Sequence, residues 1–364
     1  MSGALRATID LDALERNLGT LSRTAGGSKL LAVIKANAYG HGALACAARL
    51  EPLAQCGGFA VARVGEALQL REAGFRASVL VLGGPASPAE LEASLESRLT
   101  VAVHDWQQVE WIEAARSPVS AGWLDVWVKL DTGMHRLGFA GEELAAVYER
   151  LTNATVVRDV PVVMTHLANA DDLEDPNTRD QLERFFSWTK GWDGEVSIAN
   201  SAGVLGCPGA RAGWVRPGLS LYGISPFLSG EGGALGLVPV MTLRTRLLAV
   251  KTIDRGAPVG YGGTWRAPER MPIGIAAVGY ADGYPRGEAS TPVLVNGRET
   301  ATVGRVSMDL TALDLRAVPS ARVGDEVTLW GEGMPVERVA RPHGRIPYEL
   351  LVGLGNRVVR ELVG

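Results

Sequence analysis

Short apolar runs separated by polar segments dominate the first two thirds of the chain. Eight runs rich in Val, Ile and Leu recur roughly every 20 to 35 residues, each bounded by Gly, Pro or polar residues, as is typical of buried parallel strands. They cover residues 30–35, 58–62, 78–82, 99–103, 124–131, 161–166, 196–200 and 214–221.

Between most of these runs, apolar residues lie three or four positions apart, as they do on one face of a helix. The clearest helical segments cover residues 64–73, 105–115, 142–151 and 178–188. Eight strands that alternate with helices, over a length near that of common barrels, favour a (β/α)8 barrel over an open doubly wound sheet.

The pattern changes after residue 228. A Gly-rich hinge covers 229–236, and alternating segments with turn signals follow it with little helical period. We expect strands at 243–253, 273–278, 291–295 and 326–330, with turns at Asn296-Gly297 and Gly324-Asp325. The sequence therefore predicts an α/β barrel domain over residues 1–232 and a mainly β domain over residues 233–364.

Composition narrows the classes of function. The formal charge of −4 is scattered along the 364 residues, which leaves no basic stripe for nucleic acid or acidic lipid. No apolar run approaches the roughly 18 residues that a membrane span requires. The first residues do not resemble a secretory signal. Cys46, Cys56 and Cys207 show no metal-ligand spacing, so we expect no metal and a reducing, cytoplasmic setting.

A lysine closes the first apolar run. Lys35 follows Leu-Leu-Ala-Val-Ile and precedes a compact polar and Gly-rich loop over 36–42. Apolar surroundings disfavour the ammonium form and leave a free amine that can bond covalently to an aldehyde. An isolated lysine at a strand end is more often a surface residue with an apolar stem, so the loop is what favours chemistry here.

The ten residues Val33-Ile-Lys-Ala-Asn-Ala-Tyr-Gly-His-Gly42 resemble the cofactor-lysine motif of the alanine racemase family. Further blocks that look like those of the family are Lys129–Met134, Arg136–Gly138, Thr165-His166, Asn200-Ser201, Arg216–Gly218, Gly260–Gly262, Gly279–Gly283, Gly304-Arg305 and Met308-Asp309. Together they span nearly the full chain. The resemblance implies a barrel that binds pyridoxal phosphate (PLP), a following β domain, and a homodimer whose active sites are shared between chains.

The positions of these blocks agree with the strand pattern. Lys35, Lys129, His166, Ser201 and Arg216 each fall late in a predicted strand or just beyond it. Functional groups of barrel enzymes gather at the C-terminal ends of the strands, so we expect these side chains to meet there.

The resemblance implies that PLP is bound to Lys35. The residues that it assigns to cofactor binding are Lys35, Tyr39, His166, Ser201, Arg216, Gly218, Leu219 and Tyr222. Arg216 would face the pyridine nitrogen, which weakens the ring as an electron sink and limits side reactions such as transamination. One family feature is missing, because Asn356 stands where many members have a phosphate-binding tyrosine before the final Arg-Val segment.

The resemblance also implies two bases. Lys35 is assigned to the proton of the D enantiomer and Tyr261 to that of the L enantiomer. A phenol needs nearby positive charge to act as a base at neutral pH, which His166 could supply. Arg136 and Met308 are assigned to the substrate carboxylate. The supporting and entryway residues are Lys129, which is often carbamylated in relatives, and Asp171, Tyr280, Arg286, Arg305 and Asp309.

Two alternatives differ from this interpretation in recognisable features. Amino-acid decarboxylases of the same architecture have a glycine-rich phosphate loop in the barrel and a cysteine donor in the second domain, and here all cysteines precede residue 208. Non-catalytic PLP-binding barrels lack a second domain. Within the racemases we favour alanine as substrate, supplying D-alanine for peptidoglycan, and leave serine or a broad range of amino acids open.

Overall fold

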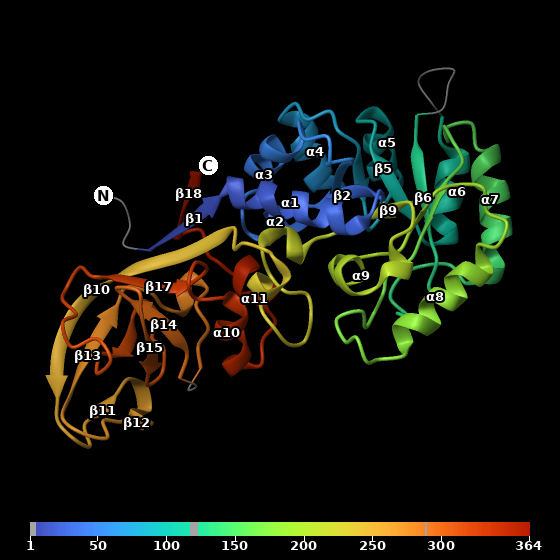
Figure 1. Cartoon of the computed structure of the whole chain (residues 1–364). Coiled ribbons are helices and arrows are strands. Elements are labelled where there is room, and N and C mark those ends of the chain that lie inside the picture. Colours follow the sequence, from blue (N-terminus) through green and yellow to red (C-terminus); the bar gives the residue numbers. More distant parts are fainter. Residues whose placement is uncertain (1–4, 117–122, 288–289) are drawn as a thin grey trace.

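The computed structural model describes residues 5–116, 123–287 and 290–364. Eight parallel strands close into a barrel, in which each strand pairs with the next along the chain (Figure 1). The closing pair joins the first and last strands, with Lys29 opposite Trp214. The strands are β2 (Lys29–Val33), β3 (Gly58–Val61), β4 (Val79–Val81), β5 (Thr100–Val103), β6 (Asp125–Lys129), β7 (Val162–Met164), β8 (Val196–Ser197) and β9 (Trp214–Val215).

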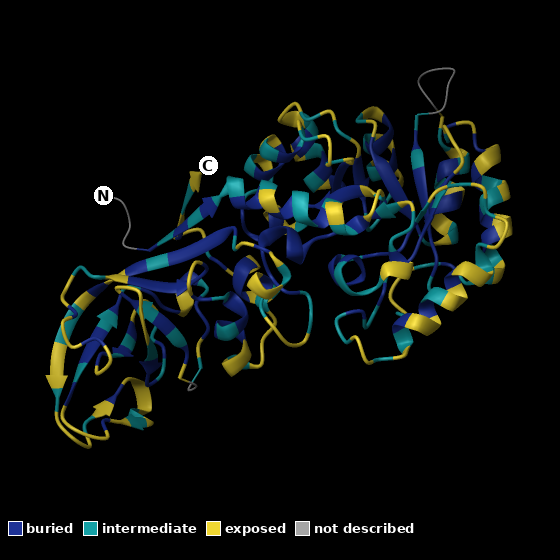
Figure 2. Cartoon of the chain, viewed as in Figure 1, coloured by how far each residue is buried: buried dark blue, intermediate teal, exposed yellow. Residues whose placement is uncertain are grey.

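Helices cover the outside of the barrel. Figure 2 shows the strands buried within and the outer helix faces exposed, which accounts for the continuous apolar runs of the strands and the 3.6-residue period of the helices. The helices of this part are α1 (Leu11–Ala25), α2 (Lys35–Tyr39), α3 (Ala43–Leu50), α4 (Val64–Glu72), α5 (Pro88–Glu96), α6 (Trp106–Ala114), α7 (Leu144–Asn153), α8 (Asn177–Trp188) and α9 (Ser201–Gly206). Short 3-10 turns are η1 (Gly141–Glu143), η2 (Pro208–Ala210), η3 (Leu219–Tyr222) and η4 (Gly232–Leu235).

The rest of the chain is mainly β. An eight-stranded sheet runs in the order β13-β16-β15-β14-β17-β10-β1-β18, and β13 also pairs with β10. Its strands are β1 (Arg6–Asp10), β10 (Met241–Ile253), β13 (Met271–Ala276), β14 (Pro292–Val295), β15 (Arg298–Val303), β16 (Thr311–Asp314), β17 (Glu326–Trp330) and β18 (Val359–Val363). The other elements are the ribbon β11 (Pro258–Val259) and β12 (Trp265–Arg266), the helices α10 (Val336–Ala340) and α11 (Pro347–Val352), and the turns η5 (Tyr261–Gly263), η6 (Tyr280–Asp282) and η7 (Arg341–His343).

The predicted fold class, a (β/α)8 barrel followed by a mainly β part, is confirmed. The predicted turn at Asn296-Gly297 is also present, and it joins β14 to β15, a strand that was not predicted, with φ angles of 49° and 74°. Positive φ at both turn positions matches the twist of the flanking strands. The apolar pattern did not predict the short helices α10 and α11. The domain boundary near residue 232 stays a prediction.

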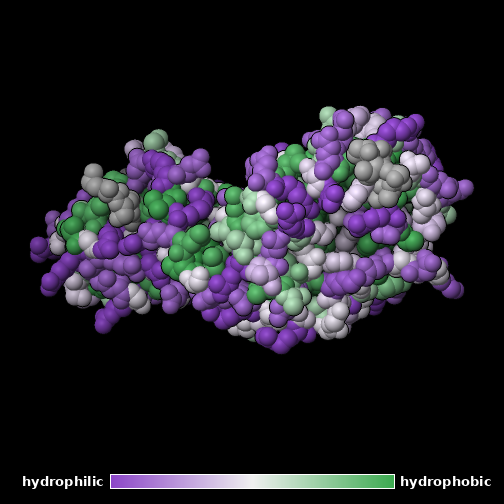
Figure 3. All heavy atoms as spheres, turned by 90° about the horizontal axis from the view of Figure 1, so that it is seen from above, coloured by the Kyte–Doolittle hydropathy of each residue, from purple (hydrophilic) through white to green (hydrophobic). Residues whose placement is uncertain are grey.

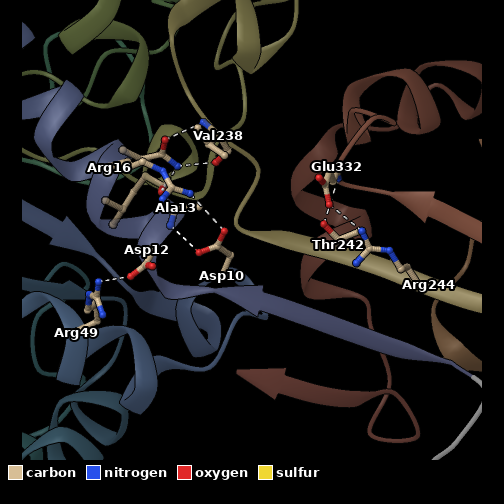
Figure 4. Close-up of polar contacts among 11 residues, drawn as sticks. Asp10, Asp12, Ala13, Arg16, Arg49, Val238, Thr242, Arg244 and Glu332 are labelled. Atoms are coloured by element: carbon tan, nitrogen blue, oxygen red, sulfur yellow. Dashed lines mark hydrogen bonds and ion pairs between the residues drawn. The ribbon is translucent and has the colours of Figure 1, made fainter. Parts of the chain in front are cut away.

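The N-terminal strand joins the two parts of the molecule. β1 pairs with β10 and β18 in the large sheet, and the chain then enters α1 on the barrel. Asp10 caps α1 by accepting a hydrogen bond from the Ala13 amide at 2.8 Å, and it also pairs with Arg16 (Figure 4). On β10, Arg244 pairs with Glu332 at 2.9 Å. Polar contacts therefore fix both strands where the chain passes between sheet and barrel.

No helix in the described ranges combines the length and the apolar character that crossing a membrane requires. Within the same ranges, no group of His, Cys, Asp and Glu side chains is arranged to hold a metal ion.

Candidate active site

A cavity of about 780 Å³ lies at the C-terminal mouth of the barrel. Lys35 follows β2, Lys129 ends β6, His166 follows β7, Ser201 follows β8, and Arg216 follows β9. All five line the cavity, as the strand pattern predicts. Further predicted site residues on its wall are Tyr39, Arg136, Asp171, Gly218 and Leu219.

Lys35 begins an unusual backbone turn. Ala36, Asn37, Ala38 and Tyr39 all have φ between 51° and 54°, so α2 is a left-handed turn. This conformation costs roughly 1–2 kcal/mol per residue for L-amino acids, and it persists only where the surroundings hold it. The buried His41 ring contributes, because its Nδ1 lies 2.9 Å from the Ala38 carbonyl oxygen and 3.0 Å from that of Tyr39.

The cavity concentrates positive charge. Burial and the charge of Arg136 lower the pKa of the Lys35 amine. Burial, followed by the charges of Arg136 and Arg216, lowers the pKa of Lys129 to about 8. Both amines therefore release their protons more readily than a lysine in water.

His166 is neutral in this environment. Burial is the main cause that lowers its pKa well below the ordinary histidine value, and the charges of Arg216 and Arg136 add to it. The lowered pKa argues against the expected role of His166 as a source of positive charge for Tyr261, and that role stays a prediction.

Arg216 is buried and has backbone partners. Its Nη2 donates to the carbonyl oxygens of Thr165 at 2.6 Å and Ile198 at 3.2 Å, and its Nη1 donates to the Ser197 hydroxyl. No carboxylate within the described part of the chain forms an ion pair with it. Burial lowers its pKa to about 10, so it stays protonated at neutral pH and brings an uncompensated positive charge to the cavity wall.

Tyr39, Ser201 and Gly218 converge on another part of the cavity. The Ser201 hydroxyl oxygen accepts hydrogen bonds from the Gly218 amide at 2.9 Å and the Ser220 amide at 3.3 Å, which leaves its own O–H free to donate. A Cβ at position 218 would collide with the Tyr39 hydroxyl. An alanine at 218 would therefore displace the Tyr39 hydroxyl, which lies together with that of Ser201 there.

Two cofactor residues from the sequence prediction differ in position. Leu219 lies on the cavity wall. Tyr222 is buried beneath the left-handed turn, where its hydroxyl donates to the Val33 carbonyl oxygen at 2.9 Å and its ring stacks on His41. Its observed contacts support the backbone that leads into Lys35.

The second part of the chain contributes cavity residues that the sequence analysis missed. Tyr348 on α11 lines the cavity and packs against Tyr39, with 5.8 Å between ring centroids. Burial, followed by the charge of Asp171, raises its pKa to about 12, so it keeps its proton as a donor. Asn356, where the family tyrosine is missing, is exposed. No hydrophobic period marks this region, and only Pro347 at the start of α11 is a local signal.

The remaining predicted site residues form a second cluster outside the barrel. Its members are Tyr261, Tyr280, Arg286, Arg305, Met308 and Asp309. Backbone contacts hold the cluster together, since the Tyr280 amide donates to the Ser307 carbonyl oxygen at 3.1 Å and the Ala281 amide to that of Met308 at 3.0 Å. The Arg305 guanidinium lies beside Gly262, 3.2 Å from where a Cβ would stand. The Arg305 side chain therefore lies beside the loop that carries Tyr261.

The two clusters do not meet within one chain. Tyr261 is 66% exposed and Met308 is 52% exposed, and neither lines the cavity. η5 lies between β11 and β12, at the end of the β part far from the barrel (Figure 1).

Two family models match the chain. The alanine racemase N-terminal domain matches residues 9–226, and the alanine racemase C-terminal domain matches residues 240–362. The chain belongs to the alanine racemase family. It is 46% identical to a catabolic alanine racemase of Pseudomonas putida, with 99% of each chain covered.

Solved structures of alanine racemases agree with this assignment. The biosynthetic alanine racemase of Pseudomonas aeruginosa superposes with a TM-score of 0.94 at 41% identity, over 99% of both chains. The alanine racemase of Bartonella henselae, solved with covalently bound pyridoxal phosphate, gives a TM-score of 0.85 at 30% identity, again over 99% of both chains.

Proposed function

We propose that this protein interconverts L- and D-alanine with PLP bound covalently to Lys35. The observation that carries the proposal is the cavity at the barrel mouth, where Lys35, with its lowered pKa, lies with Arg216 and the hydroxyl group of Ser201. Similarity to alanine racemases over the whole chain supports the same activity.

The cavity residues fit this cofactor. The Tyr39 and Ser201 hydroxyls and the backbone of Gly218 and Leu219 would hold the phosphate, since backbone N–H groups and hydroxyls replace its water shell. Arg216 would face the pyridine nitrogen with a positive charge that no carboxylate of the described residues offsets. When bound, PLP withdraws electron density from Cα of the amino acid and makes its proton removable.

We infer that two bases exchange this proton. Racemisation removes a proton from one face of Cα and returns one to the other, which two bases on opposite sides achieve without moving. Lys35 would serve the D enantiomer and Tyr261 the L enantiomer. Arg305 lies beside the loop that carries Tyr261. Arg136 and the Met308 backbone would bind the substrate carboxylate, and Lys129 and His166 would support Arg136 and Arg216.

The active enzyme would be a homodimer with shared sites. One chain keeps Tyr261 and Met308 away from its own Lys35, so a second chain must bring them to the cavity. Apolar residues reach the surface over the β part and at its junction with the barrel (Figure 3), and such surfaces are common where chains associate. Asp171, Tyr280, Arg286, Arg305 and Asp309 would then line the entry.

We place the enzyme in the cytoplasm, where its three free cysteines remain reduced. Its proposed role is to supply D-alanine for cell-wall peptidoglycan. A deletion strain that needs added D-alanine for growth would support this role, whereas growth without it would favour a catabolic one.

A direct experiment tests the activity. The purified protein is incubated with L-alanine, L-serine and a small panel of other amino acids, and products are separated by chiral chromatography. We expect D-alanine as the main product and the absorption band of a lysine-bound cofactor, absent from Lys35→Ala. A covalent band that persists in this variant would refute the Lys35 assignment, and failure to convert alanine would refute the substrate.

A further inference from the structure

Glu66 at the start of α4 reaches the turn that carries Lys35. Its Oε1 accepts a hydrogen bond from the Ala36 amide at 2.6 Å. Its Oε2 accepts from the amides of Ala62 at 2.8 Å and Arg63 at 3.1 Å. One carboxylate therefore ties the residue that follows Lys35 to the residues that follow β3.

The Ala36 amide requires such an acceptor. The first amides of any helical turn have no partner within the turn, and here the turn is left-handed and strained from Ala36 to Tyr39. A charged acceptor makes a stronger bond than a neutral one. Glu66 therefore helps to hold a conformation that Ala36, Asn37 and Ala38 would not adopt alone.

Glu66 also acts on the charge of the site. The groups that face Lys35 from neighbouring elements are Arg136 after β6, Lys129 on β6 and His166 after β7. Burial and Arg136 lower the pKa of Lys35, whereas the Glu66 carboxylate raises it. The Glu66 carboxylate thus counteracts the effect of the neighbouring cation on the pKa of Lys35.

We propose that Glu66 is a positioning residue for racemisation, whose carboxylate fixes the left-handed turn after Lys35 and so holds the lysine in place for proton transfer at Cα. The inference rests on the proposed function of Lys35. It assigns Glu66 a role beyond the capping of α4, although Glu66 does not line the cavity.

The chain offers a matched control. Glu90 occupies the same place at the start of α5, where its Oε2 accepts from the Ala86 amide at 2.8 Å. It makes no hydrogen bond to the Lys35 turn. Glu90→Gln therefore measures the cost of altering such a cap alone.

The first readout is the proton affinity of Lys35. The chain has only five lysines, so acetylation of each can be followed against pH by mass spectrometry in the full chain stripped of cofactor, after circular dichroism shows that it remains folded. We expect Glu66→Gln and Glu66→Ala to shift the midpoint for Lys35 to lower pH. The exposed Lys29, Lys190 and Lys251 serve as internal references and should not shift.

The second readout is the cofactor-loaded enzyme. In Glu66→Gln we expect kcat to fall roughly 10- to 100-fold, because a small misplacement of a reacting group has effects of this size. KM for alanine should change less than twofold. Glu66→Ala should lose more stability than Glu66→Gln, which retains one acceptor oxygen, and Glu90→Gln should keep the parental kcat.

Two outcomes separate this inference from the proposed function. If Lys35→Ala keeps the covalent band, the proposed function fails and Glu66 has nothing to position. If the cofactor is on Lys35 but Glu66→Gln matches Glu90→Gln in both kcat and the Lys35 midpoint, the inference alone is overturned.

Discussion

The barrel cavity and the exposed cluster around Tyr261 differ in how far one chain completes them. Arg216 in the cavity is buried and hydrogen-bonded to fixed backbone atoms. Tyr261 and Met308 lie in loops of the β part and are more than half exposed. The cavity is thus built by its own fold, whereas the second cluster has no function that its own chain explains.

The difference follows from where each cluster lies in the fold. Cavity side chains come from the ends of adjacent barrel strands, which closure of the sheet forces together. The Tyr261 cluster comes from loops: backbone hydrogen bonds join η6 to residues 307 and 308 before β16, and Arg305 packs against the η5 loop. These contacts fix the shape of the cluster without burying it, which leaves it available to the second chain of the proposed homodimer.

The largest expected effect tests whether Lys35 of one chain and Tyr261 of another form one active site. Lys35→Ala and Tyr261→Phe should each reduce kcat/KM for racemisation by about a thousandfold, within the usual range for loss of an acid–base group. Co-expressed, the two variants should recover roughly a quarter of parental activity, because half of the dimers are mixed and each has one intact site of two.

The control for this mixing experiment places both substitutions in one chain and mixes it with the parent. Mixed dimers then contain no intact site if sites are shared between chains, so activity should fall to roughly a quarter. Two single variants that never complement, together with a double variant that halves activity, would show that each site belongs to one chain.

A second prediction separates the two bases. The enantiomers have equal free energy, so a substitution must change kcat/KM equally in both directions, and rates alone cannot identify a base. In deuterated water, Tyr261→Phe should still exchange deuterium into D-alanine, whereas exchange into L-alanine should fall about a hundredfold or more. Equal exchange into both enantiomers would contradict the assignment.

A third prediction concerns the cavity alone. In Gly218→Ala the new Cβ collides with the Tyr39 hydroxyl, so we expect cofactor affinity to fall roughly tenfold, since overpacking costs about 1–3 kcal/mol. Gly65→Ala in α4 is the matched control, because no atom lies within 4 Å of its Cβ. Equal cofactor affinity in the two variants, measured by titration of the absorption band, would remove Gly218 from the phosphate site.

Sequence patterns predicted the barrel cavity better than the cluster around Tyr261. The eight apolar runs gave all eight barrel strands, because parallel strands buried on both faces read as continuous apolar segments. For that reason the sequence analysis could place five side chains at the C-terminal mouth of the barrel, namely Lys35, Lys129, His166, Ser201 and Arg216.

Contacts between residues far apart in the sequence could not be predicted from such patterns. Tyr348 reaches the cavity from a helix more than 300 residues after Lys35, and the lowered pKa of His166 depends on its burial and on the cations that the fold gathers around it. Glu66 looks like an ordinary helix cap in the sequence, since its bond to Ala36 depends on the pairing of β2 with β3. The contacts that the Tyr261 cluster would make in the proposed homodimer lie between chains, and no local pattern in the sequence indicates them.

The smallest expected effect is a dependence of stability on pH that arises in the cavity. The pKa of Lys129 is lowered from 10.5 to about 8, so between these values the unfolded chain binds more protons than the folded one, and the free energy of unfolding rises with pH. Relative to Lys129→Met, the parent should gain roughly 1–3 kcal/mol across this window. Urea unfolding of the full chain without cofactor would measure this gain, in degassed buffer so that carbon dioxide does not carbamylate the free amine.

The exposed Lys190→Met is the control and should show no such gain relative to the parent. Parallel curves for the parent and Lys129→Met between pH 8 and pH 10 would show that Lys129 does not titrate as a buried amine.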